Sequence, residues 1–187
     1  TKRDWAAHGD MDFRWAIIRS CDLFFYEMGL RLNAIDPWLL PRFSHELGFG
    51  ELTGIEGVDE TAGLVPDPEW KEVGFTGEGN PFWVPGDAVN LAVGQGDLLA
   101  TPLQVANMMA AIANGGTLYK PRLVLKLGAT LREEEEFFEP EEIGRLPLSP
   151  EHLQLIQEAL REVAMNPRGT AYTTFHDSPF QDLMFIN

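Results

Sequence analysis

The segment Ser20-Cys21-Asp22 places a hydroxyl, a thiol and a carboxylate next to one another. A serine hydroxyl beside a carboxylate could be functional if both side chains face one cleft. In a continuous helix, residues two apart lie about 200° apart around the axis, so Ser20 and Asp22 would face opposite sides. We therefore predict a helix break here, with Ser20 and Asp22 facing one cleft and Cys21 pointing away. A local kink or cap without a catalytic role is the other interpretation.

A second polar region lies before a helix start, where a Gly-Gln-Gly run at 94–96 follows Asp87 and Asn90. Its spacing fits neither a Walker A loop nor a dinucleotide fingerprint, and no Lys-Ser or Lys-Thr pair follows. We interpret it as a close approach of backbone around a buried turn, and not as a phosphate-binding loop.

Hydrophobic periodicity predicts the elements that position these residues. Large apolar side chains recur every three or four residues from Phe13 to Leu32, which predicts a helix interrupted near Ser20. A short helix is expected from Pro37 to Leu47. Residues 53–86, rich in glycine and proline, are expected to form an ordered irregular loop.

Later in the chain, Thr101 is a predicted N-cap, with Pro102 at the first helical position and Gln104 closing a capping box. The methionines and alanines that follow indicate a buried helix and no cofactor site. A strand is expected from Leu118 to Leu127. Ser149 then begins the last long helix.

Composition excludes several classes of partner. The chain has 187 residues, 29 acidic and 14 basic, for a formal charge of -15, so attraction to a phosphate backbone is absent and no nucleic acid is expected. No stretch approaches the roughly 20 apolar residues of a membrane span, and the first residues show no signal peptide, so we expect a segment that begins inside a longer polypeptide. Cys21 is the single cysteine, which excludes an internal disulfide and leaves the compartment open.

A set of short motifs occurs in a characteristic order along the chain. After Ser20-Cys21-Asp22 come Phe24-Phe25-Tyr26, Gly48-Phe49-Gly50, Thr53-Gly54-Ile55, Gly63-Leu64-Val65-Pro66, Trp70-Lys71, Gly86-Asp87, Gly94-Gln95-Gly96, Thr101-Pro102-Leu103-Gln104, Ala113-Asn114-Gly115-Gly116 and Pro121-Arg122. This order resembles the transpeptidase domain of class B penicillin-binding proteins over about residues 4 to 128, and 169–171 (Gly-Thr-Ala) extend it more loosely. Asp22 and the lead-ins at 3–5 and 8–9 are similar to the elongation type, penicillin-binding protein 2.

The resemblance implies an α+β fold of the serine β-lactamase/transpeptidase type, an antiparallel sheet flanked by helices beside a helical subdomain. Residues 1–128 would be mainly the helical subdomain and an adjoining strand. Residues 129–148 would form an acidic surface excursion, and 149–187 a C-terminal helix leading toward a Lys-Thr-Gly strand.

The resemblance also implies a peptidoglycan D,D-transpeptidase, in which the serine of a Ser-x-x-Lys motif attacks a stem peptide ending in D-Ala-D-Ala. β-Lactams acylate the same serine. Ser20 would relay protons between the lysine of that motif and the substrate nitrogen, and Asp22 would hold the lysine and the substrate backbone. Neither Ser-x-x-Lys nor Lys-Thr-Gly occurs in this chain, so we expect the isolated chain to be inactive. A non-catalytic structural module of a cell-wall assembly is the alternative, and a β-lactamase fits the residues less well.

Some members of the subfamily bind zinc through two aspartates, a histidine and the middle cysteine of this motif. By resemblance, His8, Cys21 and Asp4 are candidate ligands, with a fourth upstream, and His8 and Cys21 would have to converge to about 4 Å. A buried free cysteine near a surface histidine is the alternative, and no cofactor is required for the chemistry. The implied partners are stem peptides, β-lactams and a membrane glycosyltransferase. The implied location is the bacterial cell envelope, at the periplasmic face of the inner membrane, with an anchor outside this chain.

Overall fold

The computed structural model describes residues 3–75, 79–128 and 136–178, and helices dominate these residues. Their order is α1 (Phe13–Ile18), α2 (Asp22–Ile35), α3 (Leu39–Glu46), a π-helix η1 (Trp70–Gly74), α4 (Pro85–Leu91), α5 (Pro102–Ala113), α6 (Pro150–Met165) and α7 (Tyr172–Phe175). The strands are β1 (Thr117–Tyr119), β2 (Lys126–Leu127), β3 (Glu136–Phe137) and β4 (Glu142–Arg145). They form two antiparallel pairs, β1 with β4 and β2 with β3. Helices and antiparallel strands together confirm the predicted α+β class.

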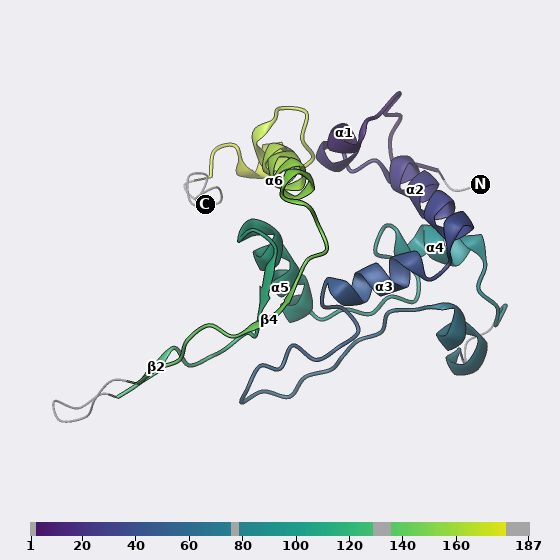
Figure 1. Cartoon of the computed structure of the whole chain (residues 1–187). Helices are drawn as coiled ribbons and strands as arrows, with labels where there is room; N and C mark the ends of the chain where they lie inside the picture. The colour runs from purple at the N-terminus through teal and green to yellow at the C-terminus, as the bar shows by residue number, and fades with distance from the viewer. Residues whose placement is uncertain (1–2, 76–78, 129–135, 179–187) are drawn as a thin grey trace.

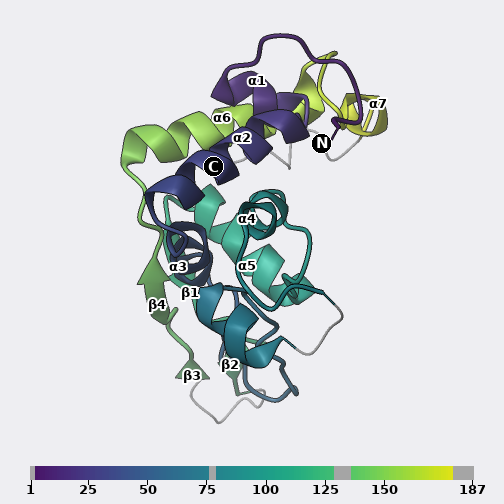
Figure 2. The same cartoon turned by 90° about the vertical axis from the view of Figure 1, so that its right-hand side faces the viewer.

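Helix α1 packs along α6, although the two are far apart in the sequence (Figures 1 and 2). Ala16 and Ile18 of α1 and Ala159 of α6 are each 0% exposed. The small alanines let the two backbones approach, while full burial of a side chain such as Ile18 contributes about 1.5 to 3 kcal/mol. This contact joins the N-terminal part of the chain to the segment that follows α6.

Helix α2 packs on α4, and a glycine sets how closely they approach (Figure 1). A Cβ added to Gly29 would lie 2.8 Å from the Ala92 Cβ and 3.0 Å from the Ala88 carbonyl oxygen. Near the end of α2, the Trp83 indole donates a 2.8 Å hydrogen bond to the Asn33 side chain. The helix pair is therefore fixed by close packing at one point and by a polar contact at another.

Helix α5 begins with the predicted capping box. The Thr101 hydroxyl accepts from the Gln104 N–H at 3.1 Å, and the Gln104 side chain accepts from the Thr101 N–H at 2.8 Å. Gln104 is 1% exposed, and its amide also donates to the carbonyls of Glu51 and Ala62 at 2.7 and 2.9 Å. One side chain thus caps α5 and anchors the loop before it.

The prediction that this helix is largely buried is wrong. Of its residues only Gln104 and Ala111 are buried, whereas Val105 and Met109 are 42% and 41% exposed. One face of α5 packs on β1 and α6, and the composition of a helix does not determine how many neighbours it has. The core on that face joins α5, β1 and α6 through Ala111, Leu118, Leu146 and Leu153.

The strand predicted from Leu118 to Leu127 is interrupted. β1 ends at Tyr119 and β2 begins at Lys126, with Pro121 between them. Proline has no N–H to donate to a ladder, which accounts for the gap. The acidic excursion returns through β3 and β4, which pair with β2 and β1, while residues 129–135 of it lie outside the described part. Its paired strands extend away from the helices (Figure 1).

In the loop predicted at 53–86, the described residues are irregular apart from η1 and the start of α4, and carboxylates organise them. Glu60 accepts from the Thr53 N–H and hydroxyl at 2.6 and 2.9 Å and from the Ile55 N–H at 2.8 Å. Lys71, 7% exposed, pairs with Asp87 and Asp97 at 3.3 and 3.2 Å.

In the described residues, no helix is both long and apolar enough to cross a membrane.

Candidate catalytic turn and metal cluster

The chain breaks between α1 and α2 at the predicted position. The Ser20 N–H donates to Ile17 O at 3.1 Å, and the Cys21 N–H donates to Ala16 O at 2.9 Å, which closes α1. Ser20 has φ of 50°, and it is the one non-glycine residue with positive φ in the described ranges. An L-residue in this region costs roughly 1 to 2 kcal/mol, so surrounding contacts must hold it there. The helix break is confirmed.

The three side chains of the motif have different surroundings. Cys21 is 4% exposed and faces Asp4 and His8, whereas Ser20 is exposed with its hydroxyl 3.2 Å from that of Thr170. Asp22 is half-buried and is the first residue of α2, where the helix dipole favours a carboxylate. Cys21 and Ser20 thus have separate partners. The sharing of one cleft by Ser20 and Asp22 stays a prediction.

The backbone of the turn is held by two segments that are distant in sequence. The Trp5 indole donates to the Ser20 carbonyl at 2.8 Å. The Thr170 N–H donates to the Ile18 carbonyl at 3.2 Å. The second bond satisfies the carbonyl of the last residue of α1, which has no helical partner, and the first satisfies the carbonyl of Ser20 just after the helix. The left-handed serine is therefore fixed by contacts that precede and follow it in the chain.

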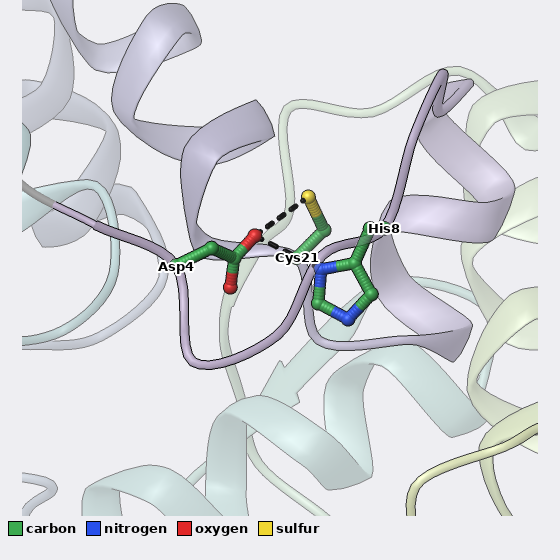
Figure 3. Close-up of side chains that lie close together, drawn as sticks. All are labelled: Asp4, His8 and Cys21. Atoms are coloured by element: carbon green, nitrogen blue, oxygen red, sulfur yellow. Dashed lines mark hydrogen bonds and ion pairs between the residues drawn. The ribbon is translucent and has the colours of Figure 1, made fainter.

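The candidate metal ligands Asp4, His8 and Cys21 come together beside this turn (Figure 3). Asp4 Oδ2 lies 2.9 Å from His8 Nδ1 and 3.2 Å from Cys21 Sγ. One ligand atom from each residue can be chosen so that all lie within 4.8 Å of one another. The side chains of His8 and Asp4 are only 2% and 5% exposed, and the Trp5 ring contacts His8 edge-on at 5.1 Å between centroids. The His8 and Asp4 side chains are therefore buried although both residues are half-buried as a whole, and with the buried Cys21 they form the predicted trio.

The cluster favours an ionised Asp4 and a neutral Cys21. Burial opposes ionisation of Asp4, but hydrogen bonds from His8, Cys21 and the Trp5 N–H outweigh it and lower its pKa to about 2. Burial raises the pKa of the Cys21 thiol, and the neighbouring Asp4 carboxylate raises it further. The thiol accordingly donates its hydrogen bond to Asp4. A bound cation would reverse this balance by stabilising the thiolate.

The donor set fits zinc. Zinc binds imidazole nitrogen, thiolate sulfur and carboxylate oxygen at about 2.0 to 2.3 Å, so the three ligand atoms, which lie within 4.8 Å of one another, would need only small side-chain adjustments to bind one ion. In the part of the chain that the structure describes, His8 Nε2 is buried with no hydrogen-bond partner. Buried ring nitrogens are normally paired, so this atom needs an explanation. The cluster also borders an open pocket of about 540 Å³, which Asp10 and Glu27 line as well.

Two partners of the turn were not predicted from the sequence. Trp5 and Thr170 both bond to the turn around Ser20, yet Thr170 is 150 residues away. Periodicity and capping report only neighbours in sequence, so neither contact has a local signal. The Gly-Thr-Ala run at 169–171 marked the segment as similar to the family without indicating what it touches.

Comparison with known proteins agrees with this geometry. The family described as penicillin binding protein transpeptidase domain matches residues 1–181. Peptidoglycan D,D-transpeptidase MrdA of Salmonella typhimurium (strain SL1344) is 33% identical over 184 residues, which cover 95% of this chain and 28% of that protein. The chain thus spans under a third of the length of this relative.

Solved structures show the same likeness. Penicillin-binding protein PBP2 from Helicobacter pylori is 33% identical with a TM-score of 0.75, covering 95% of this chain and 31% of that one. The H. pylori protein is also known in a complex with MreC, with a TM-score of 0.74 and the same identity over 95% of this chain and 30% of that one. PBP2 of Pseudomonas aeruginosa, solved with WCK 5153, is 29% identical with a TM-score of 0.76 over 94% of this chain and 38% of that one. The resemblance to the elongation type is confirmed, and the chain belongs to the transpeptidase domain family of penicillin-binding proteins.

Proposed function

We propose that this chain is the part of a peptidoglycan D,D-transpeptidase that carries its second catalytic motif, Ser20-Cys21-Asp22. The observation that carries the proposal is the left-handed turn at Ser20, in a chain of this family. The turn leaves the Ser20 hydroxyl exposed while Cys21 is buried. A strained residue with an exposed reactive group is typical of active sites.

In the proposed reaction, a serine outside these 187 residues attacks the carbonyl between the two D-alanines of a stem peptide. The serine ester forms and the terminal D-alanine leaves with a proton on its nitrogen. The amine of a second stem then attacks the ester, loses a proton, and regenerates the serine. Ser20 relays the proton to the leaving nitrogen and from the attacking nitrogen, in exchange with the lysine of the nucleophile motif.

Asp22 is proposed to hold that lysine and the substrate backbone. Its place as the first residue of α2 supports this role, since the N-terminal end of a helix stabilises a carboxylate. The half-buried side chain keeps part of its surface accessible. Ser20 would thus transfer the proton, while Asp22 would hold the charged lysine in place beside Ser20.

We also propose that Asp4, His8 and Cys21 hold a structural zinc ion, with a fourth ligand from elsewhere. Zinc bound by such a set supplies no redox chemistry and acts by fixing the positions of its ligands. Cys21 is the residue between Ser20 and Asp22, so fixing its sulfur would fix the turn on which both depend. The convergence of these three side chains beside the turn supports this proposal.

The proposed partners follow from the same function. They are stem peptides ending in D-Ala-D-Ala, β-lactams that mimic them, and a membrane glycosyltransferase that makes the glycan strands. The proposed location is the periplasmic face of the inner membrane in the cell envelope. The relative solved with MreC supports a place in a cell-wall assembly.

The test is acylation of the full-length protein by benzylpenicillin, followed as a mass shift. Ser20→Ala should slow acylation by about 10² to 10⁴, the usual contribution of a positioned acid or base, and leave thermal unfolding unchanged. Ser44→Ala is the matched control, since the Ser44 hydroxyl bonds within α3 to Leu40 O at 2.8 Å. Undiminished acylation of a folded Ser20→Ala protein would remove Ser20 from the mechanism. Absence of any adduct on the wild-type protein would favour the non-catalytic module.

A further inference from the structure

The segment that follows α6 folds over the turn at Ser20. Thr170 makes two contacts there: its N–H donates to the Ile18 carbonyl at 3.2 Å, and its hydroxyl lies 3.2 Å from the Ser20 hydroxyl. The first contact is with the backbone and would survive a change of side chain. The second depends on the threonine hydroxyl alone. A substitution at Thr170 can therefore remove the hydroxyl contact with Ser20 and keep the backbone hydrogen bond to Ile18.

The position of Thr170 is fixed by a tight turn at the end of α6. Gly169 donates to Asn166 O at 2.7 Å, and Ala171 donates to Val163 O at 3.0 Å. A Cβ on Gly169 would lie 2.3 Å from Val163 O and 2.5 Å from Glu162 O, so only glycine fits without movement. The backbone around Thr170 is therefore held by these hydrogen bonds and by the close packing of Gly169. Its contact with Ser20 is made from an ordered turn.

A second set of contacts ties this support to α1. The Arg168 guanidinium lies over the Trp15 ring, 4.5 Å from its centroid, and Arg19 donates to the Arg168 carbonyl. Arg14 forms an ion pair with Glu162. Because α1 and the segment 166–171 are held together by several bonds, the distance between the two hydroxyls is controlled by the fold.

The hydroxyl contact limits how Ser20 can rotate. A hydroxyl has one proton to donate and two lone pairs to accept with, and either member of this pair can be the donor. Among the described residues, Thr170 is the hydrogen-bond partner of the exposed Ser20 hydroxyl. Without it, the Ser20 side chain would be free to occupy other rotamers.

We propose that Thr170 is a positioning residue for Ser20, which orients the Ser20 hydroxyl for proton relay. Thr170 does not touch the substrate and acts through Ser20. This inference rests on the proposed transpeptidase function and adds a residue to it. Loss of the Thr170 hydroxyl should weaken catalysis by about the value of one neutral hydrogen bond, roughly 3- to 10-fold in rate.

The test measures benzylpenicillin acylation rates of the full-length protein in five forms: wild type, Thr170→Val, Thr170→Ser, Ser20→Ala and the Ser20→Ala/Thr170→Val double variant. Valine keeps the shape and the N–H of threonine and removes the hydroxyl. We expect Thr170→Val to be about 3- to 10-fold slower and Thr170→Ser to be close to wild type. The double variant should be as slow as Ser20→Ala alone, because Thr170 acts only through Ser20. Thr173→Val on α7 is the matched control, since Thr173 is exposed and lies outside the turn.

The outcomes separate the two proposals. If Ser20→Ala is slow while Thr170→Val acylates at the wild-type rate, the positioning role is wrong and the proposed function stands. Additive losses in the double variant would also overturn the positioning role. If Ser20→Ala acylates at the wild-type rate, the proton relay assigned to Ser20 is wrong, and the positioning role of Thr170, which acts through Ser20, is wrong with it. Should Thr170→Val unfold, Thr170→Ala replaces it, and equal rates for Thr170→Ala and Thr170→Ser would contradict the inference.

Discussion

The Cys21 thiol donates a 3.2 Å hydrogen bond to the Asp4 carboxylate, across seventeen positions of sequence. Asp4 also accepts from His8 at 2.9 Å, so a single carboxylate bridges the other two members of the cluster. This arrangement joins the extended lead-in at the start of the described chain to the turn between α1 and α2. It also places three metal-binding groups in one buried position, from which a prediction about metal follows.

Full-length protein purified without chelators should carry about one zinc ion, measured by inductively coupled plasma mass spectrometry. Cys21→Ser and His8→Ala each remove a ligand and should lower zinc affinity by more than about 100-fold, above the usual effect of residues that only support ligands. His152→Ala is the control, because His152 is exposed on α6. Zinc content that is the same in all four proteins would contradict the assignment of these ligands.

The close contact of α2 and α4 predicts an unusual response to a glycine substitution. Alanine for glycine in a helix normally stabilises by about 0.5 to 1 kcal/mol. At Gly29 the added Cβ would meet Ala92 and the Ala88 carbonyl, and overpacking of this kind costs about 1 to 3 kcal/mol. Gly29→Ala should therefore destabilise the fold, as measured by chemical denaturation.

Gly86 in α4 offers the matched control for this substitution. The nearest atom to a Cβ on Gly86 is Val84 Cγ2 at 3.9 Å, an ordinary contact. Gly86→Ala should be neutral or slightly stabilising, and Gly29→Ala/Ala92→Gly should recover part of the loss. Equal effects of Gly29→Ala and Gly86→Ala would show that the helices can separate without cost.

The capping box at the start of α5 predicts a modest loss on substitution. Thr101→Ala removes the oxygen that accepts from the Gln104 N–H, and loss of an N-cap typically costs about 1 kcal/mol. Thr101→Ser keeps the oxygen and should restore most of the stability. Denaturant unfolding of the three proteins provides the measurement, and identical midpoints for wild type and Thr101→Ala would mean that the cap contributes nothing.

Glu60 predicts a stability difference that depends on pH. Burial opposes its ionisation, but hydrogen bonds from Thr53 and from the N–H groups of Ile55 and Gly54 outweigh it and lower its pKa below 4.5. Because the folded pKa is below the unfolded one, the stabilisation is present above about pH 4.5 and is lost as pH falls through the folded value. Glu60→Gln should therefore melt below wild type at pH 7, and the gap should narrow at pH 3.5. Glu46→Gln is the control, because Glu46 is an exposed residue of α3. If the difference in melting temperature between Glu60→Gln and wild type does not change with pH, the ionised Glu60 carboxylate is not the cause of that difference.

Local features of the fold were predictable from sequence because their causes are local. A helix break was expected because only a break lets Ser20 and Asp22 face one cleft, and the run from Thr101 to Gln104 specified a capping box with both of its bonds. The interrupted strand around Pro121 shows the limit of this reasoning. A strand with an edge or irregular start at Pro121 was expected, whereas the structure divides the segment into two strands around this proline.

The contacts that complete the site are not local, and the sequence alone did not indicate them. Thr170 reaches Ser20 only because α1 packs on α6 and the chain turns back after Asn166. The sequence is compatible with a surface position for His8, whereas in the structure its side chain is only 2% exposed. The exposure of α5 likewise depends on the elements that surround it. The composition of the helix alone does not specify those neighbours.

The left-handed backbone of Ser20 sets fold stability against the proton relay that we propose for its hydroxyl. Glycine is the residue best suited to φ of 50°, and Ser20→Gly would relieve backbone strain while removing the hydroxyl. Under the proposed function, Ser20→Gly should therefore gain stability and lose acylation, whereas a purely structural Ser20 would gain stability without loss.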